Sequence, residues 1–163
     1  MEYNSQVYIC GIKPSTMTIE EEIKQSQFDD SMQKAGMNLI FTANWLSSQY
    51  AVALQPLDLS LQQLNVLAIL KGQPGHAAHV GVIKERMIDR MPNVSRLLNK
   101  LMEKGLIEKD RQLSDQRVVQ IKLTARGEEA AVQGRKLFHS VKYNLSEKEA
   151  RLLGALLERM REE

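Results

Sequence analysis

Apolar residues recur at steps of three or four from Phe28 to Leu54, which is the period of an amphipathic helix, and Pro56 forbids its continuation. A second helix is predicted to begin after Ser60, because Gln63 three residues later completes a capping box. This helix ends at the Gly-Gln-Pro-Gly sequence of residues 72–75. Residues 1–18 show no sustained period, so we expect an irregular or strand-like arm there.

The middle of the chain predicts two more helices and a hairpin. A short helix is expected over residues 78–87, and a second begins near Pro92 and ends at Gly105, a residue type favoured just after a helix. Apolar and polar residues then alternate, as a half-buried strand requires. We therefore predict two strands, Leu106–Gln112 and Val118–Thr124, joined by a short polar loop.

Two further helices are predicted to complete the chain. Thr124 is a helix cap for a segment running to about Lys142, and Ser146 with Glu149 forms another capping box. The last helix carries an apolar stripe at helical spacing: Ala150, Leu153, Leu156, Leu157 and Met160. The predicted fold class is mainly α, with a small wing of two or three β-strands.

The helix that starts at Asn93 separates its residue types into two faces. Val94, Leu97, Leu98 and Leu101 share one side. The other side carries amides, a hydroxyl and two cations: Asn93, Ser95, Arg96, Asn99 and Lys100. Asparagine pairs with adenine and Arg or Lys with guanine in a DNA major groove, but an ordinary amphipathic surface helix has the same division. The face alone therefore leaves both interpretations open.

The order of elements favours the first interpretation. A short helix, a tight turn, a polar-faced helix and a hairpin form the winged helix-turn-helix arrangement, whose second helix enters the major groove. The hairpin loop, Asp115-Gln116-Arg117, then brings an arginine to a tip that reaches the minor groove. We predict a DNA-binding lobe over residues 57–124 and a helical dimerisation region formed by residues 19–56 and 125–163.

Charge is distributed unevenly along the chain. The whole chain has a net charge of +2, but residues 84–127 hold eleven basic and six acidic residues, a net +5. This asymmetry predicts a polyanionic partner, namely double-stranded DNA. We expect phosphate contacts from Lys104, Lys109 and Arg111. An acidic protein would also suit a basic face, so a winged-helix protein-interaction module remains the alternative.

Several motifs resemble those of the MarR (multiple antibiotic resistance regulator) family. They are Leu59-Ser60-Leu61-Gln62-Gln63, Asn93-Val94-Ser95-Arg96, Leu101-Met102-Glu103-Lys104-Gly105-Leu106, Asp115-Gln116-Arg117 and Leu123-Thr124-Ala125-Arg126-Gly127. Gln116 stands where the family usually has a first wing arginine, and Ile88-Asp89 stands where a glycine and an apolar residue are common. The resemblance covers the chain from about residue 59 to its end.

The resemblance implies a transcription regulator that acts as a symmetric homodimer on a pseudo-palindromic operator, and most simply as a repressor. The apolar stripes of the first and last helices independently supply surface for such a dimer. Many members of the family have an effector cleft, and Trp45 and Tyr50 are the candidates to line it here. A small-molecule effector is thus a possible further partner.

Other chemistry finds little support in the sequence. His76, His79 and His139 lack the spacing of a metal site, and Cys10 is a single cysteine, so we expect no metal, cofactor or disulfide. No glycine-rich phosphate loop or nucleophile elbow is present, and we expect no enzyme. No apolar run is long enough for a membrane span, and we expect a cytoplasmic protein.

Overall fold

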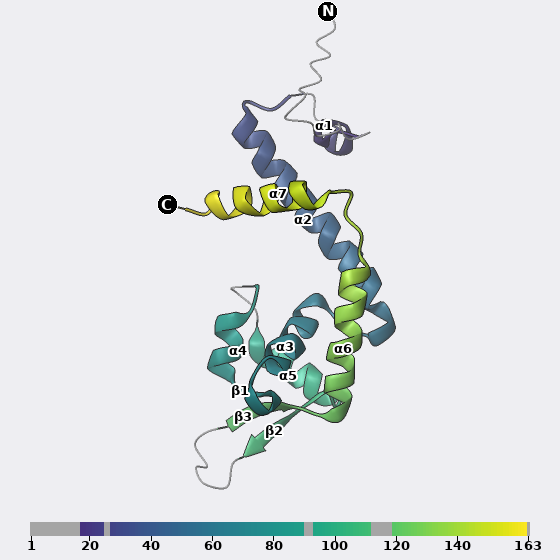
Figure 1. Cartoon of the computed structure of the whole chain (residues 1–163), viewed down its shortest axis with the longest axis vertical. Helices are drawn as coiled ribbons and strands as arrows, with labels where there is room; N and C mark the ends of the chain where they lie inside the picture. The colour runs from purple at the N-terminus through teal and green to yellow at the C-terminus, as the bar shows by residue number, and fades with distance from the viewer. Residues whose placement is uncertain (1–16, 25–26, 90–92, 112–118, 163) are drawn as a thin grey trace, which may run out of the picture. The chain divides into compact units, whose positions relative to one another are not determined.

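The computed structural model describes residues 17–24, 27–89, 93–111 and 119–162, shown in colour in Figure 1. The chain divides into two compact units, which are considered separately. One comprises Asn44–Lys142, and the other combines Met1–Ala43 with Tyr143–Glu163. The boundary between them falls inside a single helix, α2, which runs over Ser31–Leu54.

The unit Asn44–Lys142, called the lobe below, holds the end of α2 and all of the strands (Figure 1). Its remaining helices are α3 (Leu61–Lys71), α4 (Val80–Arg86), α5 (Val94–Glu103) and α6 (Ala125–Ser140), with two 3-10 turns, η1 (Gln55–Leu57) and η2 (Pro74–His76). The strands are β1 (Ala77–His79), β2 (Ile107–Arg111) and β3 (Val119–Leu123). A mainly helical winged fold is therefore confirmed.

The predicted helix starts in the lobe are present as hydrogen bonds. The Ser60 hydroxyl accepts the Gln63 backbone N–H at 3.1 Å, and the Gln63 amide oxygen accepts the Ser60 N–H at 3.0 Å. The Thr124 hydroxyl accepts the Gly127 N–H at 3.0 Å. Both caps satisfy N–H groups that have no partner inside the helix.

The sheet is antiparallel, in the order β1-β3-β2. Ile121 of β3 lies opposite Ala78 of β1 and Lys109 of β2. The hairpin of β2 and β3 is as predicted, whereas β1 lies where a helix start was expected. A three-residue strand is too short to show an alternating pattern, and only its pairing with β3 reveals it.

The core of the lobe lies between the helices and one face of the sheet. Its fully buried large side chains come from α2, α3, α4, α5 and β3: Leu54, Val66, Leu67, Leu70, Ile83, Leu101 and Ile121. The neighbouring β3 residues Gln120 and Lys122 are only half-buried. This alternation leaves one face of the hairpin in contact with water, as the sequence predicted.

The second unit contains α1 (Ile19–Ile23), the first half of α2, and α7 (Glu147–Arg159). Helix α2 begins at Ser31 rather than Phe28, because the Asp30 carboxylate accepts the N–H groups of Met32 and Gln33 at 2.7 and 2.8 Å. The capping box predicted for Ser146 and Glu149 is present at the start of α7. No helix among the described residues is long and apolar enough to cross a membrane.

Candidate nucleic-acid interface

Helix α5 turns its polar face to solvent. Val94, Leu98 and Leu101 are buried in the lobe. The predicted contact residues are all exposed on the opposite side: Asn93, Ser95, Arg96, Asn99 and Lys100. The division predicted from the helical period is therefore confirmed, and this surface is free to meet a ligand. Which of these side chains contacts a base stays a prediction.

Asn93 has a second role that the sequence analysis missed. Its side-chain oxygen accepts the backbone N–H of Arg96 at 3.0 Å, which makes Asn93 the N-cap of α5. A two-point contact with adenine uses both the oxygen and the nitrogen of an asparagine amide. The oxygen of Asn93 already accepts one hydrogen bond, so such a contact would have to use its second lone pair while the cap is kept.

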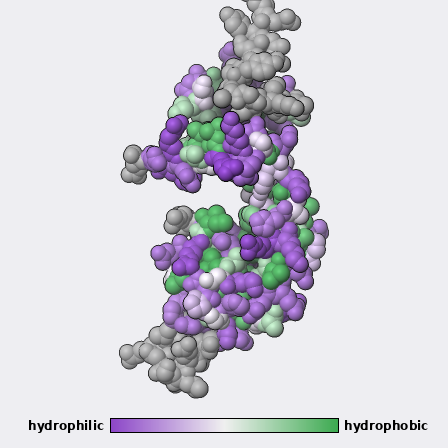
Figure 2. All heavy atoms as spheres, viewed as in Figure 1, coloured by the Kyte–Doolittle hydropathy of each residue, from purple (hydrophilic) through white to green (hydrophobic). Residues whose placement is uncertain are grey.

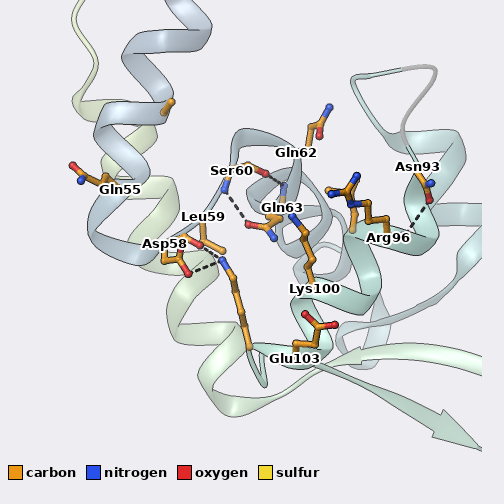
Figure 3. A pocket seen from close by; sticks show the side chains of 13 residues that line it. Gln55, Asp58, Leu59, Ser60, Gln62, Gln63, Asn93, Arg96, Lys100 and Glu103 are labelled. Carbon is orange, nitrogen blue, oxygen red and sulfur yellow. Dashed lines mark hydrogen bonds and ion pairs between the residues drawn. The ribbon is translucent and has the colours of Figure 1, made fainter.

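A groove of about 840 Å³ runs between α5 and the start of α3 (Figure 3). Arg96 and Lys100 extend into it from α5, and Gln62 and Ser60 line its opposite side. All of its lining residues belong to the lobe. The groove adds the exposed Ser60 and Gln62, at the start of α3, to the polar surface of α5. No local sequence signal identified it.

Lys104, a predicted phosphate contact, is engaged within the lobe. Its ammonium group lies 2.9 Å from the Asp58 carboxylate and also donates a hydrogen bond to the Asp58 carbonyl oxygen. Two of the three N–H donors of this ammonium are thus used by Asp58, so a phosphate contact by Lys104 would compete with or share this pairing. Lys109 is exposed on β2 and remains available.

The remaining wing predictions fall outside the described structure. The backbone of Arg111, the last residue of β2, pairs with Val119, but the structure does not describe the Arg111 side chain. Asp115, Gln116 and Arg117 also lie outside them. Their proposed contacts with the minor groove stay predictions.

Trp45 and Tyr50, the predicted effector residues, lie in different surroundings. Trp45 is exposed, whereas Tyr50 is buried and stacks on Phe138 of α6, with 4.3 Å between the ring centroids. A cavity of about 530 Å³ between α3 and α6 is lined by Phe138 and by apolar residues such as Leu61 and Leu64. Neither Trp45 nor Tyr50 is among its lining residues.

A hydrogen bond connects the end of η2 to α6. The His76 Nδ1 lies 2.8 Å from a Glu128 carboxylate oxygen. The hydrogen bond from His76 lowers the pKa of Glu128 below its ordinary value, and the charge of His76 acts in the same direction. Within the described ranges no three metal-ligating side chains come together.

The sequence profile of the transcriptional regulators SarA/Rot matches residues 49–132, slightly more than half of the chain. The matched range contains α3, α4, α5 and the strands described above. This chain belongs to the SarA/Rot family of transcriptional regulators. Its lobe is therefore the part that carries the family signature. Among curated proteins, no sequence matches this chain significantly.

Solved structures with the same fold are regulators of the MarR type, as the sequence resemblance predicted. The organohalide-sensing regulator RdhR bound to 2,4-dichlorophenol has a TM-score of 0.71 at 18% identity, covering 84% of this chain and 85% of that one. A MarR variant from E. coli in complex with operator DNA has a TM-score of 0.69 at 22% identity, covering 84% and 100%. BpsR of Bordetella bronchiseptica, regulated by 6-hydroxynicotinic acid, has a TM-score of 0.66 at 21% identity, covering 85% and 99%.

Proposed function

We propose that this SarA/Rot-family regulator reads a specific double-stranded DNA sequence with α5, as a homodimer on a pseudo-palindromic operator. The observation that carries the proposal is the exposed polar face of α5, with Arg96 and Lys100 beside the groove at the start of α3. Bound at a promoter, such a dimer would exclude the polymerase, so we expect repression. Acting on bacterial DNA would place the protein in the cytoplasm.

Binding to random duplex DNA at several salt concentrations tests the electrostatic part of the proposal. We expect the logarithm of the affinity to fall linearly with the logarithm of the salt concentration, because bound cations release counterions from the phosphates. Undetectable binding at low salt would instead favour the protein-interaction module.

Recognition of a specific base sequence by α5 is tested with DNA duplexes that the wild-type protein selects from a random pool. Arg96→Ala should weaken binding to the selected duplex by roughly 1–3 kcal/mol and relax the preference at one base pair. Arg96→Lys keeps the charge but not the planar fork of donors, and should retain the non-specific affinity. Unchanged selectivity in both variants would exclude Arg96 from base reading.

The homodimer is supported by apolar side chains that the second unit leaves exposed. Met32 and Ile40 of α2 are 81% and 57% exposed, and Leu152 and Leu156 of α7 are 48% and 43% exposed. Figure 2 shows hydrophobic surface over α7 between hydrophilic side chains. Sedimentation equilibrium should give a dimer for the wild type and a monomer for Leu156→Glu, whereas Arg151→Glu, on the opposite side of α7 from Leu153 and Leu156, should leave the dimer intact.

Small-molecule control would use the cavity between α3 and α6. Its apolar walls have Lys71 and Arg135 beside them, and Ile88 of the turn before α5 also lines it. An anilinonaphthalene sulfonate probe should therefore gain fluorescence on binding. Ala68→Phe, which fills the cavity, should abolish the gain, while Ala125→Phe at an exposed site outside it should not.

A further inference from the structure

Helix α5 is held near both of its ends by side chains from one short segment, Asp58–Asn65. Before α5, the Gln62 amide donates to the Asp89 carboxylate at 2.7 Å, and the Asn65 oxygen accepts the backbone N–H of Ile88 at 2.9 Å. After α5, the ammonium of Lys104 pairs with Asp58. These contacts join residues between 23 and 46 positions apart in the chain.

The segment that makes these contacts is itself fixed. Asp58 has a left-handed backbone with φ of 50°, and its N–H donates to the Gln55 carbonyl at 2.9 Å. The capping box of Ser60 and Gln63 follows, and Leu59 and Leu64 anchor the segment in the core. Its polar side chains therefore start from a defined position in the same compact unit as the groove.

Two of the side chains concerned are acids in a lobe that has a basic surface. Asp58 and Asp89 carry negative charge, which on a DNA-binding protein opposes the approach of phosphates. Their contacts give these acids a structural role. Asp89, four residues before the N-cap of α5, accepts a hydrogen bond from Gln62 of α3. Asp58 pairs with Lys104, the C-cap residue of α5. A side chain that lowers the attraction to phosphates but sets the position of α5 should change the affinity for operator DNA and the affinity for random DNA by different amounts.

We propose that the Asp58–Asn65 segment is a clasp that orients α5, and that Asp58, Gln62 and Asp89 are positioning residues for operator discrimination. This inference rests on the proposed DNA-binding function. Base-edge hydrogen bonds are directional, so a small rotation of α5 removes them while leaving phosphate contacts intact. The clasp therefore acts on selectivity rather than on overall affinity.

The decisive variants are Asp89→Ala and Asp58→Asn. Asn tolerates the left-handed backbone at position 58, so that variant keeps the turn. The control is Glu85→Gln on α4, because Glu85 is exposed and has no hydrogen bond or ion pair with any described residue. All three variants remove one negative charge from the lobe, but only the first two disturb the clasp.

Affinities are measured by fluorescence anisotropy for a duplex selected by the wild type and for a shuffled duplex of equal length. We expect Asp89→Ala and Asp58→Asn to bind the shuffled duplex at least as tightly as wild type. Their preference for the selected duplex should fall by roughly threefold to tenfold, as for the loss of one hydrogen bond. Glu85→Gln should keep the wild-type preference, and melting temperatures should show that all three fold.

A double-mutant cycle separates positioning from direct base contact by Gln62. If Gln62 acts through Asp89, the Gln62→Ala/Asp89→Ala double variant loses no more selectivity than either single variant. Independent, additive losses would overturn the positioning role of Gln62. Unchanged selectivity in Asp89→Ala and Asp58→Asn would overturn the clasp, whereas a wild-type protein that enriches no duplex from the random pool would overturn the proposed function instead.

Discussion

Helices α5 and α7 carry the same kind of apolar stripe but lie in different surroundings. In α5, Leu98 is 4% exposed and Leu101 is fully buried, because α3 and the sheet cover them. In α7, Leu153 and Leu156 are 44% and 43% exposed, and none of the helix residues is buried. Amphipathic pattern alone therefore does not show whether a helix is covered by its own chain or by another.

The difference extends to the two units. The lobe buries a contiguous core, whereas Ile19 is the one buried hydrophobic residue that the structure describes in the second unit. The core of the lobe is large enough to support folding of the lobe on its own. The exposed apolar stripes of the second unit are instead stabilised when another surface covers them. The lobe is thus expected to be stable at any concentration, and the second unit to depend on a partner copy.

The largest expected effect contrasts Leu101 with Leu156. Leu101→Ala should lower the free energy of unfolding by about 2–5 kcal/mol at every protein concentration, because it leaves a cavity in the core. Leu156→Ala should act mainly by weakening association, so its effect should grow as the protein is concentrated. Urea unfolding at two protein concentrations measures both, and equal concentration dependence in the two variants would contradict the comparison.

A second contrast concerns the tight packing of the lobe at Gly127. A Cβ there would lie 1.9 Å from the Leu106 carbonyl oxygen, a backbone atom that cannot easily move. Gly127→Ala should therefore cost about 1–3 kcal/mol of stability. Gly81→Ala is the control, because no heavy atom lies within 4 Å of its Cβ position, and calorimetry should show unchanged or raised stability.

The cap of α5 predicts a smaller effect. Asn93→Ala should cost about 1 kcal/mol, since the Arg96 N–H loses its acceptor. Asn93→Ser restores an acceptor and should regain most of the stability measured by thermal unfolding. If Asn93 also reads a base, the serine variant should still bind the selected duplex weakly, while full recovery of binding would assign Asn93 to capping alone.

The smallest expected effect is a change in titration. His76→Ala should raise the pKa of Glu128, which the hydrogen bond from His76 holds below its ordinary value. Because the folded-state pKa of this carboxyl is lowered, its contribution to stability is present above the unfolded value and is lost as pH falls through the folded value. Carbon-detected NMR titration of the glutamates measures the shift.

Ser146→Ala, at the N-cap of α7, is the matched control for His76→Ala, because it also removes a side-chain hydrogen bond to a glutamate. There the Ser146 hydroxyl lowers the pKa of Glu149 through a local hydrogen bond, so this variant should raise the pKa of Glu149 alone. A rise for Glu128 in Ser146→Ala, or for Glu149 in His76→Ala, would show that the two titrations are not separate.

Features that depend on near neighbours could be predicted from the sequence. The capping boxes of Ser60 and Ser146, the Thr124 cap and the buried side of α5 all join residues a few positions apart. Such contacts form whenever the local helix forms, because helical geometry places these residues together. The motifs that resemble the MarR family are also short stretches of consecutive residues. The SarA/Rot match confirms that they belong to a winged-helix transcriptional regulator.

The tertiary structure decided the rest. Strand β1 exists only because β3 offers it a partner, and Lys104 meets Asp58 only because α5 packs against α3. Gln62 and Asp89 are 27 positions apart, so no periodicity in the sequence could pair them. The sequence by itself thus determined which surface is polar and basic. The packing of helices determined how that surface is held, since the positions of distant side chains depend on every buried contact between them.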